Sequence, residues 1–167
     1  MTEGFRIRRL GVADAAAFRA IRLEALAAQP EAFGSSVEEE AAQPEEVFIG
    51  RLAEGAIFGG WLEGRPELAG VMALAVPDKA KSRHKGLLWG VYLCPVARGT
   101  GLAPAMLRHL LDHARGVVEE VRLSVTRGNG PARSLYLRAG FTDWALEPRA
   151  LKIGGTYHDE HLMVLRF

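Results

Sequence analysis

Apolar residues recur along the chain in two patterns, short runs of strand length and stripes at helical spacing. Strand-length runs lie at residues 5–10, 57–62, 68–76, 87–93, 121–125, 141–146 and 161–166. The run at 87–93 is apolar almost throughout, which is typical of a strand covered on both faces. Residues 63–66, Glu-Gly-Arg-Pro, separate the second and third runs and predict a hairpin between them.

Four helices are expected between these strands. The first is expected to start at Asp14, which can act as its N-cap, and to stop before Pro30. A short second helix begins near Pro44, and the last covers residues 131–139, with Gly140 as the left-handed residue after it. The apolar stripes are Phe18, Ile21, Ala25 and Leu26 in the first helix, and Leu102, Met106, Leu110 and Ala114 in the third.

The order of these elements, β-α-α-β-β-β-α-β-α-β-β, predicts an α/β fold with a mixed sheet. Residues 31–43 are polar, small and acidic, and are interpreted as a loop or a broken helix. A chain of 167 residues suits one domain and buries about two-thirds of its unfolded surface, so it needs neither a metal nor a disulfide to fold. We find no repeat, low-complexity segment or linker, and therefore expect a single domain over residues 1–167.

Composition and charge narrow the choice of partners. The chain has 21 Lys and Arg against 20 Asp and Glu, a balance that favours neither a nucleic acid nor a membrane surface as partner. No uncharged apolar run reaches the ~18 residues that a membrane span needs, and the N-terminal segment lacks a signal-peptide core. Cys94 is the lone cysteine, so an internal disulfide is excluded and a thiolate zinc site is not expected. We expect a soluble cytoplasmic protein.

A glycine-rich turn joins the strand at 87–93 to the third helix. The first N–H groups of a helix have no partner within it, and the helix dipole favours an anion in front of them. Gly99 and Gly101 would let a large ligand approach the backbone closely, and Arg98 adds positive charge. The turn therefore indicates a phosphate or pyrophosphate site; the alternative is a turn that only connects. Its spacing fits neither a P-loop nor a dinucleotide fingerprint.

Two motifs lie a strand apart in the second half of the chain. The first is Arg98-x-x-Gly101-x-Ala103, and the second is Asn129-x-x-Ala132-x-x-Leu135-Tyr136-x-x-x-Gly140-Phe141. In sequence and order they resemble the signatures of the GCN5-related N-acetyltransferases, the GNAT superfamily. Residues 30–36 also resemble the region before the second helix in many small bacterial members. The expected order of elements agrees with the family over nearly the whole chain.

The resemblance implies a central sheet of about seven strands with about four helices, splayed between the fourth and fifth strands. Acetyl-CoA would lie in this splayed cleft as cosubstrate, without a metal. The backbone of Val91, Tyr92 and Leu93 would pair with the pantetheine arm, and residues 99–104 would supply amides to the pyrophosphate. The residues expected at the cofactor are Val91, Tyr92, Leu93, Arg98, Gly99, Thr100, Gly101, Leu102, Ala103, Pro104 and Asn129. For Asn129, an N-cap or turn role is the alternative.

Tyr136 is implied to be the catalytic residue. A phenol with an ordinary pKa near 10 can protonate the departing CoA thiolate at neutral pH. The alternative is a plain core tyrosine. The resemblance thus implies an N-acetyltransferase whose primary amine acceptor attacks the thioester directly in a ternary complex. A non-catalytic acyl-CoA-binding or sensor domain is the competing interpretation. Dimers are frequent among relatives, so a homodimer is one expected assembly.

An ammonium cannot attack a carbonyl, so the amine must lose a proton. Candidate bases on the expected acceptor side are Glu24, Glu31, Asp159 and Glu160, with a solvated charge as the alternative for each. Residues 157–160 resemble the segment that precedes the final strand in relatives, and are expected to form the acceptor-side wall.

Four other features are interpreted as structural. The acidic run at 38–40, with Glu45 and Glu46, is expected to be a solvated face that could also attract a cationic acceptor. The basic residues at 78–85 are expected in a solvated hairpin loop. His109 and His113 are four residues apart on a helix, but surface or packing roles are favoured over a metal pair. Cys94 is expected to be a small packed side chain rather than a nucleophile.

Overall fold

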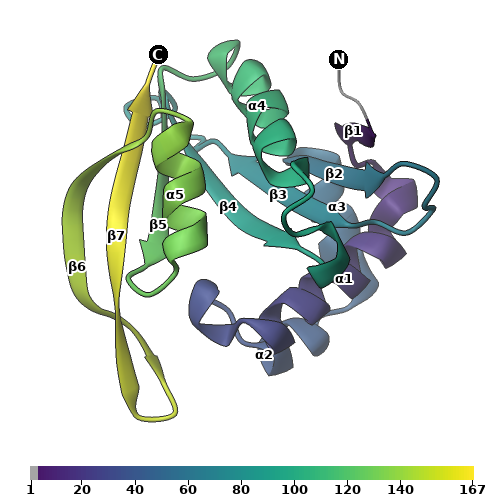
Figure 1. Ribbon diagram of the computed structural model, residues 1–167, viewed down its shortest axis with the longest axis horizontal. Coiled ribbons are helices and arrows are strands. Elements are labelled where there is room, and N and C mark those ends of the chain that lie inside the picture. The colour runs from purple at the N-terminus through teal and green to yellow at the C-terminus, as the bar shows by residue number, and fades with distance from the viewer. Residues whose placement is uncertain (1–3) are drawn as a thin grey trace.

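A seven-stranded sheet in the order β1-β2-β3-β4-β5-β7-β6 organises the computed structural model, which describes residues 4–167 (Figure 1). The strands are β1 (Phe5–Arg9), β2 (Ala56–Leu62), β3 (Gly70–Ala75), β4 (Lys85–Leu93), β5 (Glu120–Thr126), β6 (Thr142–Ile153) and β7 (Thr156–Arg166). The helices are α1 (Ala15–Ala28), α2 (Val37–Ala41), α3 (Glu45–Glu54), α4 (Leu102–Arg115) and α5 (Gly130–Arg138). The α/β fold with a mixed seven-stranded sheet is confirmed.

Helices cover both faces of the sheet (Figure 1). On one face, α4 and α5 pack on a core that includes Met72, Leu88, Leu123 and Val125. On the other face, α1 and α3 pack on a second core, to which α1 contributes its predicted stripe. The stripe residues Phe18, Ile21, Ala25 and Leu26 are all buried, as are Leu102, Met106, Leu110 and Ala114 of α4.

The sheet opens between β4 and β5. These two parallel strands pair only where Lys85–Leu87 meets Glu120–Arg122, and they separate beyond that point. The pairing of β3 with β4 shifts register between Val71 and Ala73, and Gly90 of β4 has a φ of +63°. This bulge bends β4 away from β5, since an extra residue on one strand disrupts the local ladder. The expected splay is therefore confirmed.

The C-terminal hairpin is longer than predicted. Strands were expected at 141–146 and 161–166, but β6 ends only at Ile153 and β7 begins at Thr156. Gly154 and Gly155 join them with φ values of +54° and +83°, a two-residue turn of the kind that hairpins favour. The segment has few apolar residues because much of it is exposed, and periodicity therefore missed it. Asp159 and Glu160 lie within β7, not before the last strand.

The broken helix expected at residues 31–43 is present, whereas the cover expected on both faces of β4 is not. Residues 31–43 contain a fifth helix, α2, whose first turn is closed by a reciprocal pair of hydrogen bonds between Ser36 and Glu39. The strand β4 is not covered on both faces, because the side chain of Leu87 is 48% exposed and the middle of the strand faces a cavity. The basic residues at 78–85 do lie in a largely exposed loop.

Asp14 precedes α1 as expected, but its side chain does not cap that helix. Its carboxylate instead accepts from the Gly11 amide at 2.8 Å and pairs with both terminal nitrogens of Arg8. The Arg8 guanidinium holds the pKa of Asp14 at about 2. Within residues 4–167, no helix is long and apolar enough to cross a membrane.

Candidate functional site

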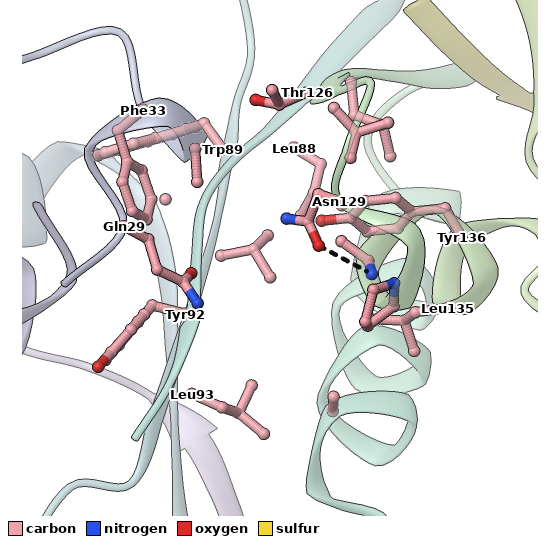
Figure 2. A pocket seen from close by; sticks show the side chains of 18 of the residues that line it. Gln29, Phe33, Leu88, Trp89, Tyr92, Leu93, Thr126, Asn129, Leu135 and Tyr136 are labelled. Atoms are coloured by element: carbon pink, nitrogen blue, oxygen red, sulfur yellow. Dashed lines mark hydrogen bonds between the residues drawn. The ribbon is translucent and has the colours of Figure 1, made fainter. Parts of the chain in front are cut away.

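A cavity of about 720 Å³ occupies the opening between β4 and β5 (Figure 2). Its walls come from residues 87–93 of β4, residues 123–126 of β5, the turn before α4, and α5. The remaining wall lies on the α1 face of the sheet and includes Arg22 and residues 32–35. The cavity therefore has an α4–α5 side and an α1 side.

On the α4–α5 side, the turn before α4 presents free backbone amides. Gly99 and Gly101 have φ values of +72° and +93°, which L side chains rarely adopt. The hydroxyl of Thr100 donates to Ala97 O at 2.6 Å and accepts from the Leu102 amide at 3.3 Å. Within the described chain, the amides of residues 99, 101 and 103 have no hydrogen-bond partner. Such a cluster at a helix N-terminus suits an anion.

The predicted cofactor residues divide into two groups. Those that line the cavity are Val91, Tyr92, Leu93, Arg98, Gly99, Gly101, Ala103 and Asn129. Thr100, Leu102 and Pro104 do not line it. Leu102 is fully buried in the core below, and Thr100 shapes the turn through its hydroxyl. Pro104 is exposed and has no N–H, so it cannot be one of the amide donors that the sequence suggested.

Tyr92 turns its side chain away from the opening. Its hydroxyl donates to Glu24 Oε1 at 2.9 Å, and burial together with this contact raises the pKa of Tyr92 to about 12. Only the backbone of Tyr92 is thus free to meet a ligand in the cleft. Glu24 is engaged in the same bond and is not among the residues that line the cavity.

Asn129 and Tyr136 lie on α5 and its N-terminal turn, facing the cavity (Figure 2). The side-chain oxygen of Asn129 accepts from the Ala132 amide at 3.3 Å, so the capping role is confirmed and its amide NH₂ is the group left for a ligand. Tyr136 is 5% exposed, and its ring meets Phe141 edge-on at 5.9 Å. Burial raises the pKa of Tyr136 above its ordinary value, which keeps the phenol protonated at neutral pH.

Of the four candidate bases, only Glu160 lines this cavity. Glu31 and Asp159 line a neighbouring cavity of about 590 Å³ together with Tyr157. Asp159 also accepts from the Arg149 amide at 2.9 Å. Glu160 lies opposite Glu147 in the β6–β7 ladder, and burial, reinforced by the Glu147 charge, raises the pKa of Glu160.

Sequence reasoning missed several residues of the cavity. Arg22, Phe33 and Trp89 line its α1 side, and Arg138 of α5 lines it as well. Arg22 had a detectable signal, because it follows Phe18 by four residues and so falls on the apolar stripe of α1. Phe33 and Trp89 carried no such signal, since a large aromatic side chain is normally packed in the core.

The structure agrees with the interpretation of Cys94, His109 and His113 as packed side chains. The Cys94 thiol contacts Leu68 O at 3.7 Å, and burial raises its pKa to about 11, which disfavours a thiolate nucleophile. His109 and His113 pack edge-on against Phe58 at 5.3 and 5.5 Å.

The solvated face expected for the acidic residues is exposed at Glu38, Glu39, Glu45 and Glu46, but the expectation is wrong for Glu40. Glu40 is only 3% exposed, buried in ion pairs with Arg22 and Arg51 rather than solvated.

Comparisons with known proteins agree with this geometry. The profile described as Acetyltransferase (GNAT) family matches residues 18–141. A GNAT-family acetyltransferase from Streptococcus pneumoniae superposes with a TM-score of 0.86 at 20% identity, over 98% of this chain and 99% of its own. The yncA protein of Salmonella typhimurium, solved with its cofactor acetyl-CoA, superposes with a TM-score of 0.80 at 21% identity, over 98% of this chain and 94% of its own. A ribosomal-protein-alanine N-acetyltransferase from Brucella melitensis superposes with a TM-score of 0.79 at 21% identity, over 97% of this chain and 99% of its own. At these identities, the solved structures establish a shared fold.

Proposed function

Because the chain belongs to the acetyltransferase (GNAT) family, we propose that it transfers the acetyl group of acetyl-CoA to a primary amine. The amine attacks the thioester directly in a ternary complex, within one N-acetyltransferase domain over residues 1–167. The observation that carries this proposal is the open sheet. The β4 edge beyond Leu87 has no strand beside it on the β5 side, and it faces a cavity lined by residues from both faces of the sheet.

Acetyl-CoA occupies the α4–α5 side of the cavity in this proposal. The pantetheine arm runs along the free edge of β4 at residues 91–93, where its amides replace the missing strand. The pyrophosphate meets the free amides of residues 99, 101 and 103, with Arg98 and Arg138 as nearby cations. The Asn129 side-chain amide donates to the same ligand.

The acceptor enters from the α1 side. Its amine nitrogen attacks the acetyl carbon, and the C–S bond then breaks to release CoA as a thiolate. Tyr136 gives its proton to this sulfur, and its raised pKa ensures that the proton is present at neutral pH. Glu160 takes the proton from the attacking amine, directly or through one water. Its raised pKa makes it a stronger base than an ordinary glutamate.

A negative charge placed at the free amides tests the cofactor site. Ala103→Glu puts a carboxylate at the second position of α4, where it suits the helix dipole but repels a pyrophosphate. We expect the affinity for acetyl-CoA, measured by calorimetry, to fall by at least about tenfold, which corresponds to the loss of one or more charge-assisted hydrogen bonds. The thermal stability of the variant should stay at the wild-type level. Arg108→Gln changes the net charge equally on an exposed position of α4 and serves as the control.

Unchanged affinity in Ala103→Glu would contradict the placement of the cofactor. Turnover is measured alongside binding with a panel of amines. Acetyl-CoA binding by the wild type without transfer to any amine would favour the sensor interpretation instead.

A further inference from the structure

One guanidinium nitrogen at the α1 side of the cavity has no acceptor. Arg22 is 5% exposed, and its Nη1 is buried without a hydrogen-bond partner in residues 4–167. Arg22 lines the cavity, and Nη1 lies 3.6 Å from the position that a Cβ on Gly90 would take. Gly90 is the bulge residue at which β4 leaves β5. The unpartnered nitrogen therefore lies beside the bulge at which the two strands separate.

The rest of the Arg22 side chain is held in place. Its Nε and Nη2 both donate to Glu40 Oε1, at 3.1 and 2.8 Å. The guanidinium also stacks over Phe33 at 5.1 Å and Trp89 at 5.4 Å. Nη1 cannot turn to another acceptor without breaking these contacts. A guanidinium fixed in this way is organised for a ligand before the ligand arrives.

The charge of the cluster indicates the sign of the missing partner. Glu40 also accepts from Arg51 at 2.9 Å, so one carboxylate faces two guanidinium groups. One positive charge is thus left without a counter-charge inside the cluster. Leaving a buried N–H of a cation unpaired is unfavourable, whereas a single carboxylate would satisfy both the hydrogen bond and the charge. A charge-assisted hydrogen bond from the guanidinium nitrogen Nη1 to a carboxylate oxygen is about twice as strong as one to a neutral acceptor.

We propose that the acceptor is a small amino carboxylate whose carboxylate binds Nη1 of Arg22 while its amine faces the thioester. The proposal rests on the acetyltransferase function above and names the substrate class for the same cavity. The two ends of the acceptor then meet different groups on the α1 side. Arg22 takes the carboxylate next to Phe33 and Trp89, and Glu160 on β7 takes the amine proton. A free amino acid or a close analogue satisfies both requirements, whereas an internal lysine of a protein lacks the carboxylate.

Matched acceptors test the substrate class. The panel holds the common L-amino acids, their decarboxylated amines, their carboxamides and short peptides with a free N-terminus, each with labelled acetyl-CoA. We expect kcat/KM for at least one amino acid to exceed that of its decarboxylated and amide partners by about 10- to 100-fold, the range of one charge-assisted hydrogen bond. Equal rates within every matched set, or transfer only to compounds without the carboxylate, would overturn the inference.

Two variants separate the cavity role of Arg22 from its packing role. Arg22→Gln and Arg51→Gln each remove one guanidinium from Glu40, but Arg51 does not line the cavity. In Arg22→Gln, the preference for the carboxylate is expected to disappear through a higher KM for the amino acid. The ratio of kcat/KM for the amino acid to kcat/KM for its decarboxylated amine is therefore expected to fall toward one. In Arg51→Gln, the preference stays within about threefold of the wild type, because the Nη1 donor remains.

Binding of acetyl-CoA is measured by calorimetry in all three proteins. It is expected to be unchanged, since Arg22 lies on the far side of the sheet from the amide cluster. A protein that binds acetyl-CoA and acetylates only amines without a carboxylate keeps the proposed function and loses this inference. A protein that does not bind acetyl-CoA loses both. Retention of the carboxylate preference in Arg22→Gln would remove Arg22 from the acceptor site.

Discussion

At the scale of single residues, burial sets the protonation state of the groups that face the cavity. Tyr136 is buried, and its phenol keeps its proton at neutral pH because the phenolate would have to leave water. Glu160 is shifted in the same direction by burial and by the Glu147 charge, which in a carboxylic acid strengthens the conjugate base. Burial thus keeps the phenol of Tyr136 protonated and makes the carboxylate of Glu160 more basic.

Replacing Tyr136 with Phe tests the proton donor. The variant keeps the ring and its contact with Phe141 but loses the hydroxyl, so we expect kcat to fall by on the order of 10²-fold. The KM for acetyl-CoA should change little, because the phenol acts when the thiolate leaves. Tyr157→Phe on the exposed hairpin is the matched control and should keep the wild-type kcat. A wild-type rate in Tyr136→Phe would return this residue to the core.

The pH dependence of kcat/KM tests Glu160. A base works when ionised, so the rate should rise with pH through the pKa of Glu160, which is raised above its ordinary 4.5. In Glu160→Gln, kcat/KM should no longer rise with pH in this range, and it should be lower than in the wild type by on the order of 10²-fold. In Glu147→Gln, the rise of kcat/KM should move to lower pH, because the variant lacks the charge that raises the pKa of Glu160. Asp159→Asn, which faces the neighbouring cavity, is the control; identical profiles in all four proteins would exclude Glu160.

At the scale of elements, helix ends set the position of the site. The helix α4 begins at the two left-handed glycines, which is why its first amides face the cavity. The helix α5 ends at Arg138, and after it the Phe141 amide donates to Tyr136 O at 3.0 Å and the Gly140 amide donates to Leu137 O at 3.0 Å. This pair of bonds is the Schellman motif. It fixes the backbone of Tyr136 at the end of its helix.

Two glycine replacements should shift stability in opposite directions. Gly140 has a φ of +101°, and a Cβ there would lie 3.3 Å from Leu165 Cδ1, so Gly140→Ala should lower the free energy of unfolding. The left-handed conformation alone costs about 1–2 kcal/mol in an L residue. Gly50 lies inside α3 with no atom within 4 Å of an added Cβ. Gly50→Ala should therefore raise stability by about 0.5–1 kcal/mol. Denaturant unfolding measures both, and equal signs would contradict this account.

At the scale of the whole molecule, the sheet is held together across β4 and β5 by one short stretch of pairing. Lys85–Leu87 and Glu120–Arg122 form the only ladder between these two strands in the part of the chain described. Beyond it, the packing of α4 and α5 on one shared core connects the two halves of the sheet. A ligand bound in the cavity acts as a further connection between the halves.

Hydrogen exchange tests this connection. Amides of β4 that face the opening have no strand partner, so they should exchange quickly in the free protein. At about 100 times its Kd, acetyl-CoA should stabilise the folded protein by roughly 2.7 kcal/mol and slow exchange in peptides covering residues 88–93 and 99–103. Peptides from β2, which pairs with β1 and β3, are the internal control. Protection confined to segments away from these residues would contradict the cofactor placement.

Local patterns determined much of this architecture. The buried stripe of α1, the turn before α4 and the end of α5 before Gly140 all follow from residues within one or two turns of each other. Each depends on backbone conformation and short-range spacing, which the sequence displays directly. The residues that resemble the GNAT signatures lie in these local elements, and for that reason nine of the twelve predicted site residues were found on the cavity; the exceptions are Thr100, Leu102 and Pro104.

Tertiary contacts decided the rest. Glu40 looked like part of a solvated run, but Arg22, 18 positions away in the chain, pairs with it and buries it. Glu160 and Glu24 were equal candidates in sequence, and only the pairing of β7 with β5 and of Tyr92 with Glu24 separates them. The position of the free Nη1 of Arg22 at the Gly90 bulge is likewise set by a contact between distant segments, α1 and β4. Such features depend on which segments meet in space, and a pattern along one segment does not contain that information.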